Sequence, residues 1–510
     1  MPDYFKLRIC ITVFLLITFT AYSQNKATGI FDGQTDVGNP AIRGFSVYNV
    51  QKQQYTVDGA GTNMWFGHDQ FHFLWKKMKG DFILRANVAF IGVSKEAHRK
   101  LGWMVRSSLD SSSANVNAVV HGGGLTSLQY RRNTGDSVQE IKSSLSGANV
   151  IQLERRGNIY IMSVAQQGKL FVTQELSDLN LGDDVYVGLF VCSHNAAVSE
   201  RAIFDNVRII VPAKPDFVPY KDYIGSNIEI LNIEDGNSNI IYQSPRSLQA
   251  PNWMKNGASL LYNSEGLLYK FNLTTKKPEV LITGTARNNN NDHVISFDGK
   301  MLTISNHSKQ DNENSIGYIL PITGGEPKRI TTTGPSYMHG WSPDGKYLAY
   351  TAERNNEFDI YKIDTNGKNE TRLTTAPGLD DGPEYSPDGR YIYFNSTRTG
   401  MMQLWRMKPD GSGQQQMTND SLNNWFPHIS PDGKWIVFIS FNKNVAADDH
   451  PFYKHVYLRM MPAAGGSPKV IAYLYGGQGT INTPSWSPDG RQIAFVSNTQ
   501  LLFNIFPIEK

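Results

Sequence analysis

A tetrapeptide, Ser-Pro-Asp-Gly, recurs in the second half of this 510-residue chain and limits the fold more than any other feature. It stands at residues 342–345, 386–389, 430–433 and 487–490, with a weaker copy at 296–299 and a degenerate Asn-Gly at 256–257. Successive copies are 42, 46, 44, 44 and 57 residues apart. A period of about 40–45 residues with several short strands in each unit is typical of a β-propeller.

Each repeat has the same internal order: a short strand, the Asp-Gly turn, an apolar strand, and then a third and an outer fourth strand. Glycine accepts positive φ and aspartate hydrogen-bonds its own backbone, so the tetrapeptide is interpreted as a structural turn. Six copies predict six blades. Residues 227–243 precede the first copy and are strand-like, so they can complete the last blade and close the ring. If that stretch is a decayed repeat, seven blades result.

The first half of the chain has a different pattern. Between about residues 30 and 211, strand-like alternation, as at Phe82, Leu84 and Ala86, occurs without internal repetition or helical spacing. This predicts a two-sheet β-sandwich. Three prolines between residues 212 and 219 cannot donate to a strand ladder and predict a linker. We therefore expect an all-β chain with a sandwich at 24–211, a linker at 212–223 and a propeller at 224–510.

Residues 1–23 have the features of a signal peptide. A basic start precedes a short apolar run at 9–20, and small residues follow at Ala21 and Ser23. We expect cleavage before Gln24 and export to the periplasm or the cell exterior, with an uncleaved anchor as the alternative. No other run approaches the roughly 20 apolar residues of a membrane span.

Composition excludes two further classes of protein. The chain has only two cysteines, Cys10 and Cys192, so it cannot be a disulfide scaffold. Its formal charge of +3 gives no electrostatic reason to expect nucleic acid as a partner.

The repeats resemble those of the TolB-like propeller family, which carry the pattern Trp-Ser-Pro-Asp-Gly-Lys/Arg before an apolar strand. Residues 341–346 and 486–491 match this pattern. The resemblance covers about 224–510 and implies the fold more than the function, because such propellers serve as scaffolds, peptidase domains and lyases. The first half resembles the concanavalin A-like lectin/glucanase jelly roll, on residues 80–82 and 102–106.

The turn geometry predicts a functional site at the mouth of the propeller. Residues four or five positions before each Asp-Gly turn lie about 13–17 Å from it on the innermost strand, at the opposite face. The insertion near 441–455, which causes the 57-residue spacing, should overhang the same mouth. Convergent polar groups there would bind a ligand. The alternative is a wet channel without function. The expected ligand-binding residues are His293, His339, Asp380, Asp381, Glu384, Asn424, His428, His450, Gln478 and Asn482.

The sequence is compatible with two kinds of chemistry at this mouth, metal-assisted catalysis and acid–base catalysis. His293, His339, His428 and Glu384 could hold a divalent metal ion. Such a site is similar to the histidine-rich metal site of oligogalacturonate lyases, although the register of the histidines differs. His339, His428 and His450 are the candidates for acid–base catalysis without metal.

Three functions follow. The first is an exported protein that binds a glycan or a cell-envelope component. The second is a metal-assisted carbohydrate lyase or hydrolase that uses the same site, and the third is a TolB-like envelope scaffold. A weaker sugar site is expected in the sandwich, at Arg106, His121, Gln129 and Arg131. We expect a monomer with no nucleic-acid partner and no membrane span after signal cleavage.

Overall fold

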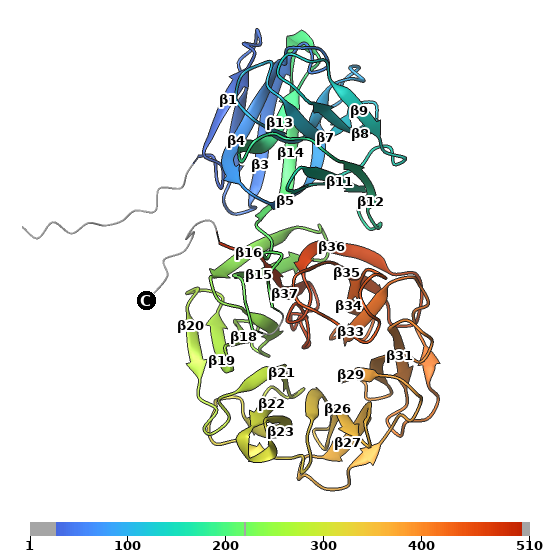
Figure 1. The fold of residues 1–510 in the computed structure, drawn as a ribbon. Coiled ribbons are helices and arrows are strands. Elements are labelled where there is room, and N and C mark those ends of the chain that lie inside the picture. The colour runs from blue at the N-terminus through green and yellow to red at the C-terminus, as the bar shows by residue number, and fades with distance from the viewer. Residues whose placement is uncertain (1–26, 219–220, 502–510) are drawn as a thin grey trace, which may run out of the picture.

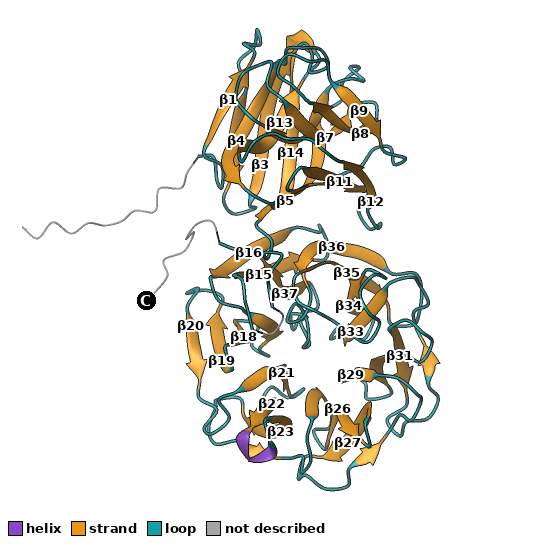
Figure 2. Ribbon diagram, in the orientation of Figure 1, coloured by secondary structure: helices purple, strands orange, loops and turns teal. Residues whose placement is uncertain are grey.

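The computed structural model describes residues 27–218 and 221–501 (Figure 1). The predicted signal peptide, residues 1–23, lies outside the described residues. The described secondary structure is β throughout, apart from one 3₁₀ turn, η1 (Lys309–Asp311) (Figure 2). Within these residues, no helix has the length and apolar character needed to cross a membrane.

The first fourteen strands form two seven-stranded antiparallel sheets. In spatial order, the first sheet contains β1 (Gly33–Val37), β4 (Phe71–Lys79), β13 (Asp184–Cys192), β6 (Lys100–Arg106), β7 (Asn115–His121), β8 (Thr126–Arg131) and β9 (Gln139–Lys142). The second contains β12 (Val172–Leu176), β11 (Ile159–Ala165), β10 (Val150–Arg156), β5 (Phe82–Ile91), β14 (Asn195–Ile210), β3 (Gln54–Gly61) and β2 (Phe45–Asn49).

One apolar core joins these two sheets. Trp103 and Leu189 of the first sheet and Leu84 and Leu153 of the second belong to a single buried cluster. The alternation that starts at Phe82 therefore supplies one face of β5 to this core, because successive strand residues point to opposite faces. The likeness of these sheets to the concanavalin A-like fold stays a prediction.

The remaining strands form a ring of six blades, so the predicted six-bladed propeller is confirmed (Figure 1). Five blades are four-stranded meanders: β17 (Gln249–Trp253), β18 (Ser259–Ser264), β19 (Leu267–Asn272) and β20 (Pro278–Leu281); β21 (Asn289–Ile295), β22 (Met301–Ser308), β23 (Asn314–Pro321) and β24 (Lys328–Arg329); β25 (Ser336–Trp341), β26 (Tyr347–Arg354), β27 (Glu357–Asp364) and β28 (Thr371–Arg372); β29 (Asp380–Tyr385), β30 (Ile392–Ser396), β31 (Gln403–Met407) and β32 (Gln415–Gln416); β33 (Asn423–Ile429), β34 (Trp435–Phe441), β35 (Lys454–Pro462) and β36 (Lys469–Gly476).

The sixth blade closes the ring with strands from both ends of the propeller sequence. It contains β16 (Ser238–Ser244), β15 (Ser226–Asn232) and β37 (Gln492–Asn498), and an isolated bridge adds Trp486 inside β37. Residues 227–243 thus complete the last blade, which leaves neither end of the ring as an open sheet edge. No seventh blade is present among the described residues.

The repeated motif has a structural role in every copy. In the third blade, Ser342 Oγ donates to Asp344 Oδ1 at 2.6 Å and accepts the N–H of Tyr347 at 2.9 Å, which closes the turn. The Trp341 indole N–H donates to the Val294 carbonyl of the preceding blade at 3.0 Å. The serine and aspartate therefore build the turn, and the tryptophan joins neighbouring blades.

The two domains are docked against each other rather than joined by a free linker (Figure 1). Ile83 of β5 and Ile210 of β14 share a buried cluster with Tyr453 and Tyr475 of the propeller. The N–H of Ala213, in the proline-rich segment, donates to the Tyr475 hydroxyl at 3.1 Å. The outer face of the second sheet is thus an interface.

Candidate functional site

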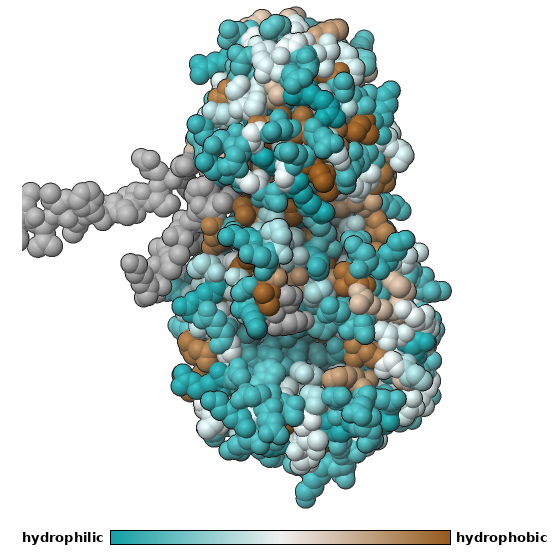
Figure 3. All heavy atoms as spheres, viewed as in Figure 1, coloured by the Kyte–Doolittle hydropathy of each residue, from teal (hydrophilic) through white to brown (hydrophobic). Residues whose placement is uncertain are grey.

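A cavity of about 830 Å³ lies at the mouth of the propeller. Figure 3 shows a hydrophilic hollow at the centre of the ring. Innermost strands of several blades contribute to it, together with the loop between β34 and β35. The lining residues discussed below are Gln249, Asn263, the run Asn288 to Asn291, Asp292, Tyr337, His339, Asp381, Phe426, Asp448, His450, Gln478 and Asn482.

Two aspartates and two histidines form the charged centre of the cavity. His339 Nε2 lies 3.4 Å from Asp381 Oδ1 and 3.9 Å from Asp292 Oδ1. His450 Nε2 lies 4.0 Å from Asp381 Oδ2. The Thr351 hydroxyl donates to Asp381 Oδ1 at 2.6 Å, which fixes this carboxylate between the two imidazoles. Side chains from three blades and the insertion loop thus meet in one cluster.

The environment moves the pKa values of the two histidines in opposite directions. Burial alone would lower the pKa of His339, but the carboxylates of Asp292 and Asp381 outweigh burial and raise it. Burial lowers the pKa of His450, with only partial opposition from Asp381. His339 is therefore the better proton donor and His450 the better proton acceptor near neutral pH.

The two aspartates also differ. Burial, with the nearby Asp381 carboxylate, raises the pKa of Asp292 to about 6. Burial would raise the pKa of Asp381 too, but the hydrogen bond with His339, the charges of His339 and His450 and the Thr351 hydroxyl together outweigh burial and lower it. Asp381 is thus the fixed negative charge of the cluster, whereas Asp292 changes its charge close to physiological pH.

Aromatic rings cover one side of this cluster. The Phe426 ring stacks on His339 with 6.0 Å between centroids and also contacts His450 at 5.3 Å. Phe426 has a φ of 55°, in the left-handed region that a bulky side chain seldom adopts. Such backbone strain persists only where the surrounding structure enforces it, and it is common at binding sites.

The structure brings only part of the expected site together. Of the residues expected from the sequence, His339, Asp381, His450, Gln478 and Asn482 line the cavity. The other five residues do not. Each innermost strand that carries an expected residue contains a β-bulge, and its one or two extra residues change which side chains face the channel.

The proposed metal set is not assembled, which corrects the sequence interpretation. His428 Nδ1 lies 2.6 Å from Glu384 Oε2, and its Nε2 bonds to the Ile481 carbonyl, so neither ring nitrogen is free for a metal. His293 is fully buried among backbone groups of neighbouring strands, and burial lowers its pKa to about 4. Among the described residues, no three His, Cys, Asp or Glu side chains are arranged to hold a metal ion.

Asp380 and Asn424 are occupied by structural contacts. Asp380 Oδ2 accepts a hydrogen bond from Arg398 Nη2 at 2.7 Å. The amide of Asn424 donates to Gln403 Oε1 at 3.2 Å and accepts from the Ser440 hydroxyl at 2.7 Å. Neither Asp380 nor Asn424 lines the cavity. Both side chains therefore stabilise blades instead of facing a ligand.

The predicted insertion, residues 441–455, overhangs the mouth with only part of its length. Asp448 and His450 line the cavity. His455 instead reaches the other domain, where its Nε2 lies 3.0 Å from Glu154 Oε2. The loop therefore contributes both to the cavity and to the contact between domains.

Several lining residues were not expected from the sequence. The clearest is the run of four asparagines at Asn288 to Asn291, of which the last three begin β21 at the mouth. Its place at the start of an innermost strand was a usable signal. The aromatic residues Tyr337 and Phe426 gave none, because an aromatic residue in a strand normally belongs to the core.

The weaker site expected in the first domain is built mainly of paired groups. Arg131 Nη1 and Nη2 donate to both oxygens of Asp69, at 2.9 and 2.7 Å, and Arg106 Nη2 lies 3.5 Å from the same carboxylate. The Gln129 amide lies 3.2 Å from His121 Nε2. Arg106 and Arg131 are fully buried, so their charges already have a partner inside the domain.

Comparisons with known proteins concern the propeller. The TolB β-propeller domain model, PD40, matches residues 311–455. The uncharacterized protein Atu1656 of Agrobacterium fabrum is 47% identical over 285 residues, which are 56% of this chain and 94% of that protein. A solved structure described as a putative TolB from Agrobacterium tumefaciens is 45% identical with a TM-score of 0.52, and the match covers 56% of this chain and 100% of that one. TolB from Acinetobacter baumannii is 18% identical with a TM-score of 0.40, over 50% of this chain and 64% of that one.

Proposed function

This chain belongs to the TolB β-propeller family through its second domain, and from that premise we propose that it is an exported protein that binds a carbohydrate at the propeller mouth. The observation that carries the proposal is the cavity of about 830 Å³ with eight Asn and Gln side chains among its lining residues. Ligand sites of drug-sized molecules commonly measure about 300–1,000 Å³. The cavity thus has room for a short oligosaccharide.

The carboxamide lining suits sugar hydroxyl groups. An Asn or Gln side chain offers both N–H donors and a carbonyl acceptor, and a hydroxyl group likewise donates and accepts. Tyr337 and Phe426 add aromatic surface beside these polar groups. The combination favours a polyhydroxylated ligand with one apolar face.

The charge of the lining narrows the ligand class. Four acidic residues line the cavity, Glu265, Asp292, Asp381 and Asp448, against a single arginine and no lysine. A polyuronate or phosphorylated glycan would meet like charge at this mouth. We therefore favour a neutral or amino-substituted sugar of the cell envelope.

The opposed pKa shifts of His339 and His450 favour a second candidate, an acid–base enzyme on the same ligand. Neutral His450 would accept a proton from a water molecule as the water oxygen bonds to the anomeric carbon, and protonated His339 would donate a proton to the glycosidic oxygen as its bond to that carbon breaks. Asp381 contacts both rings and would hold their orientation. The chemistry requires no metal.

A glycan panel measured for both binding and product release tests the proposal. Neutral and amino-substituted oligosaccharides should bind by titration calorimetry, and Asp381→Asn should weaken binding by about 10- to 100-fold, because one charged hydrogen bond is worth about 1.5–3 kcal/mol. His68→Gln, on an exposed histidine of the first domain, is the matched control and should bind as the native chain does.

Three outcomes separate the alternatives. Binding without released product supports a binding protein. Product formation that His450→Gln abolishes while binding remains supports the enzyme. Failure of every glycan to bind, or equal binding by Asp381→Asn, would refute the mouth as a carbohydrate site.

A further inference from the structure

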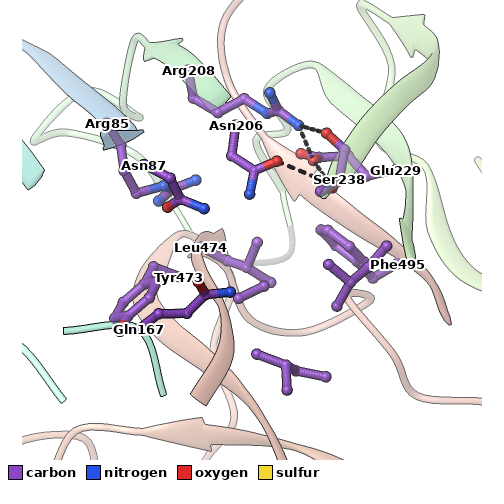
Figure 4. Close-up of a pocket in the computed structure, with 13 residues that line it drawn as sticks. Arg85, Asn87, Gln167, Asn206, Arg208, Glu229, Ser238, Tyr473, Leu474 and Phe495 are labelled. Carbon is purple, nitrogen blue, oxygen red and sulfur yellow. Dashed lines mark hydrogen bonds and ion pairs between the residues drawn. The ribbon is translucent and has the colours of Figure 1, made fainter. Parts of the chain in front are cut away.

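A second, smaller cavity of about 30 Å³ lies at the interface between the two domains (Figure 4). Polar residues of β5 and β14 form its first-domain wall, and strands β15, β36 and β37 form the propeller wall. A cavity of this size has room for one or two water-sized occupants. The site is distinct from the propeller mouth, and neither proposed function uses it.

Two buried arginines stand side by side on the first-domain wall. Arg85 of β5 and Arg208 of β14 are directly opposite each other in the antiparallel ladder. Each is only 6% exposed. Like charges at directly opposed positions destabilise a sheet, and burial removes the water that would screen them. The pair therefore requires negative charge nearby.

The propeller supplies a single carboxylate, Glu229, for the two arginines, and its ion pair is with Arg208. Arg208 Nη2 donates to Glu229 Oε2 at 2.6 Å and to the Ser238 carbonyl at 2.8 Å (Figure 4). The second Glu229 oxygen is taken by the hydroxyl of Ser497. Within the described residues, the Arg85 side chain has no hydrogen bond or ion pair (Figure 4).

The cavity therefore holds one uncompensated positive charge. Burial lowers the pKa of Arg85 to about 10, so its guanidinium is still charged at neutral pH. The Tyr473 hydroxyl also lines this region, but burial raises its pKa and its proton goes to the Lys169 carbonyl at 2.6 Å. Tyr473 is thus neutral and offers no counter-charge. An unpaired buried charge costs several kcal/mol unless an ion compensates it.

We propose that this interdomain cavity binds a small monovalent anion, of the size of chloride, as the counter-ion of Arg85. The amide of Asn87, which lies beside Arg85 in Figure 4, provides further N–H donors. Because one wall of the cavity belongs to each domain, the anion stabilises their docked arrangement.

Two measurements on the full chain test this proposal. The thermal unfolding midpoint is measured in sodium chloride and in sodium gluconate at equal ionic strength, since gluconate is a much bulkier anion than chloride. Each tenfold rise of chloride above its dissociation constant should stabilise the folded state by about 1.4 kcal/mol. In crystals soaked in sodium bromide, the anomalous signal of a bound bromide should lie within contact distance of the Arg85 guanidinium.

Substitution of the arginine completes the test. Arg85→Met should remove the chloride dependence and, in gluconate, should unfold at a higher temperature than the native chain, because the unpaired charge is gone. Arg99→Met is the control: Arg99 is similarly buried but is paired with Glu200 at 2.6 Å, so its loss should lower the midpoint equally in both salts.

A cavity that holds only water gives clear contrary results. The native midpoint would then be the same in both salts, and no bromide would occupy the cavity. Chloride dependence that persists in Arg85→Met would also overturn the proposal. If Arg85→Met fails to fold, the bromide measurement on the native chain decides.

Discussion

Replacement of Asp292 by asparagine should make the protein more stable at neutral pH and leave its stability unchanged in acid. Asp292 is buried beside the Asp381 carboxylate, and its pKa rises from 3.8 to about 6. The folded chain therefore binds a proton more tightly than the unfolded chain does between these two values. In that window the native chain loses stability as the pH rises, and the loss persists at higher pH.

The size of the effect follows from the shift. A rise of about two pKa units, at about 1.4 kcal/mol for each unit, corresponds to about 3 kcal/mol of stability lost above pH 7. Asparagine has the same shape and no titratable proton, so Asp292→Asn escapes this loss. The same change should lower the pKa of His339, because the Asp292 carboxylate is one of the charges that raise it.

Urea denaturation at intervals from pH 4 to pH 8 measures the difference in free energy of unfolding between the variant and the native chain. We expect a difference near zero at pH 4 that grows to about 3 kcal/mol by pH 7. Asp388→Asn is a control of opposite sign: hydrogen bonds from Ser386 and Arg390 lower the pKa of Asp388 to about 2. A difference independent of pH, or a variant less stable at pH 8, would refute the reasoning.

Glu154→Gln should weaken domain docking by about 1–2 kcal/mol near neutral pH. Burial would raise the pKa of Glu154, but His455 and Arg156 together outweigh burial and lower it, so calorimetry should show the loss fade as the pH falls through that lowered pKa. Trp341→Phe should cost about 1–3 kcal/mol in chemical denaturation, because it leaves the buried Val294 carbonyl without the indole donor, and an unchanged midpoint would contradict this. Cys192 should react with thiol reagents only after unfolding, since it is fully buried and burial raises its pKa to about 11; rapid labelling of the native chain would disprove this.

The repeats predicted the propeller well because blade structure is local. The Ser-Pro-Asp-Gly turn requires a hydroxyl, a carboxylate and a residue with positive φ at fixed spacing, and all of these are readable from a few consecutive residues. The position of the turn also placed the opposite ends of the innermost strands at the mouth. His339 and Asp381 could thus be predicted to face a common cavity.

The pairing of His428 with Glu384 could not be predicted in the same way. These residues are on different blades, 44 positions apart, and their side chains form a hydrogen bond with each other instead of facing the channel. His293 follows a bulge in β21 with two extra residues, so its orientation does not follow from simple alternation along the strand. Spacing from the turn predicted the position of each residue along its strand. It did not predict on which face of the strand the side chain lies.

The sequence by itself thus determined the β architecture, the six repeated units and the end of the ring at which polar groups collect, because turns and strands follow from neighbouring residues. The choice between six and seven blades needed the tertiary structure. Only the tertiary structure decided which polar groups share the mouth, and that Arg85 and Arg208 face a single carboxylate across the domain interface. Those outcomes depend on bulges and on contacts between distant segments. The energies of these side-chain pairings are set by burial and by nearby charge. Neither can be read from the order of residues along the chain.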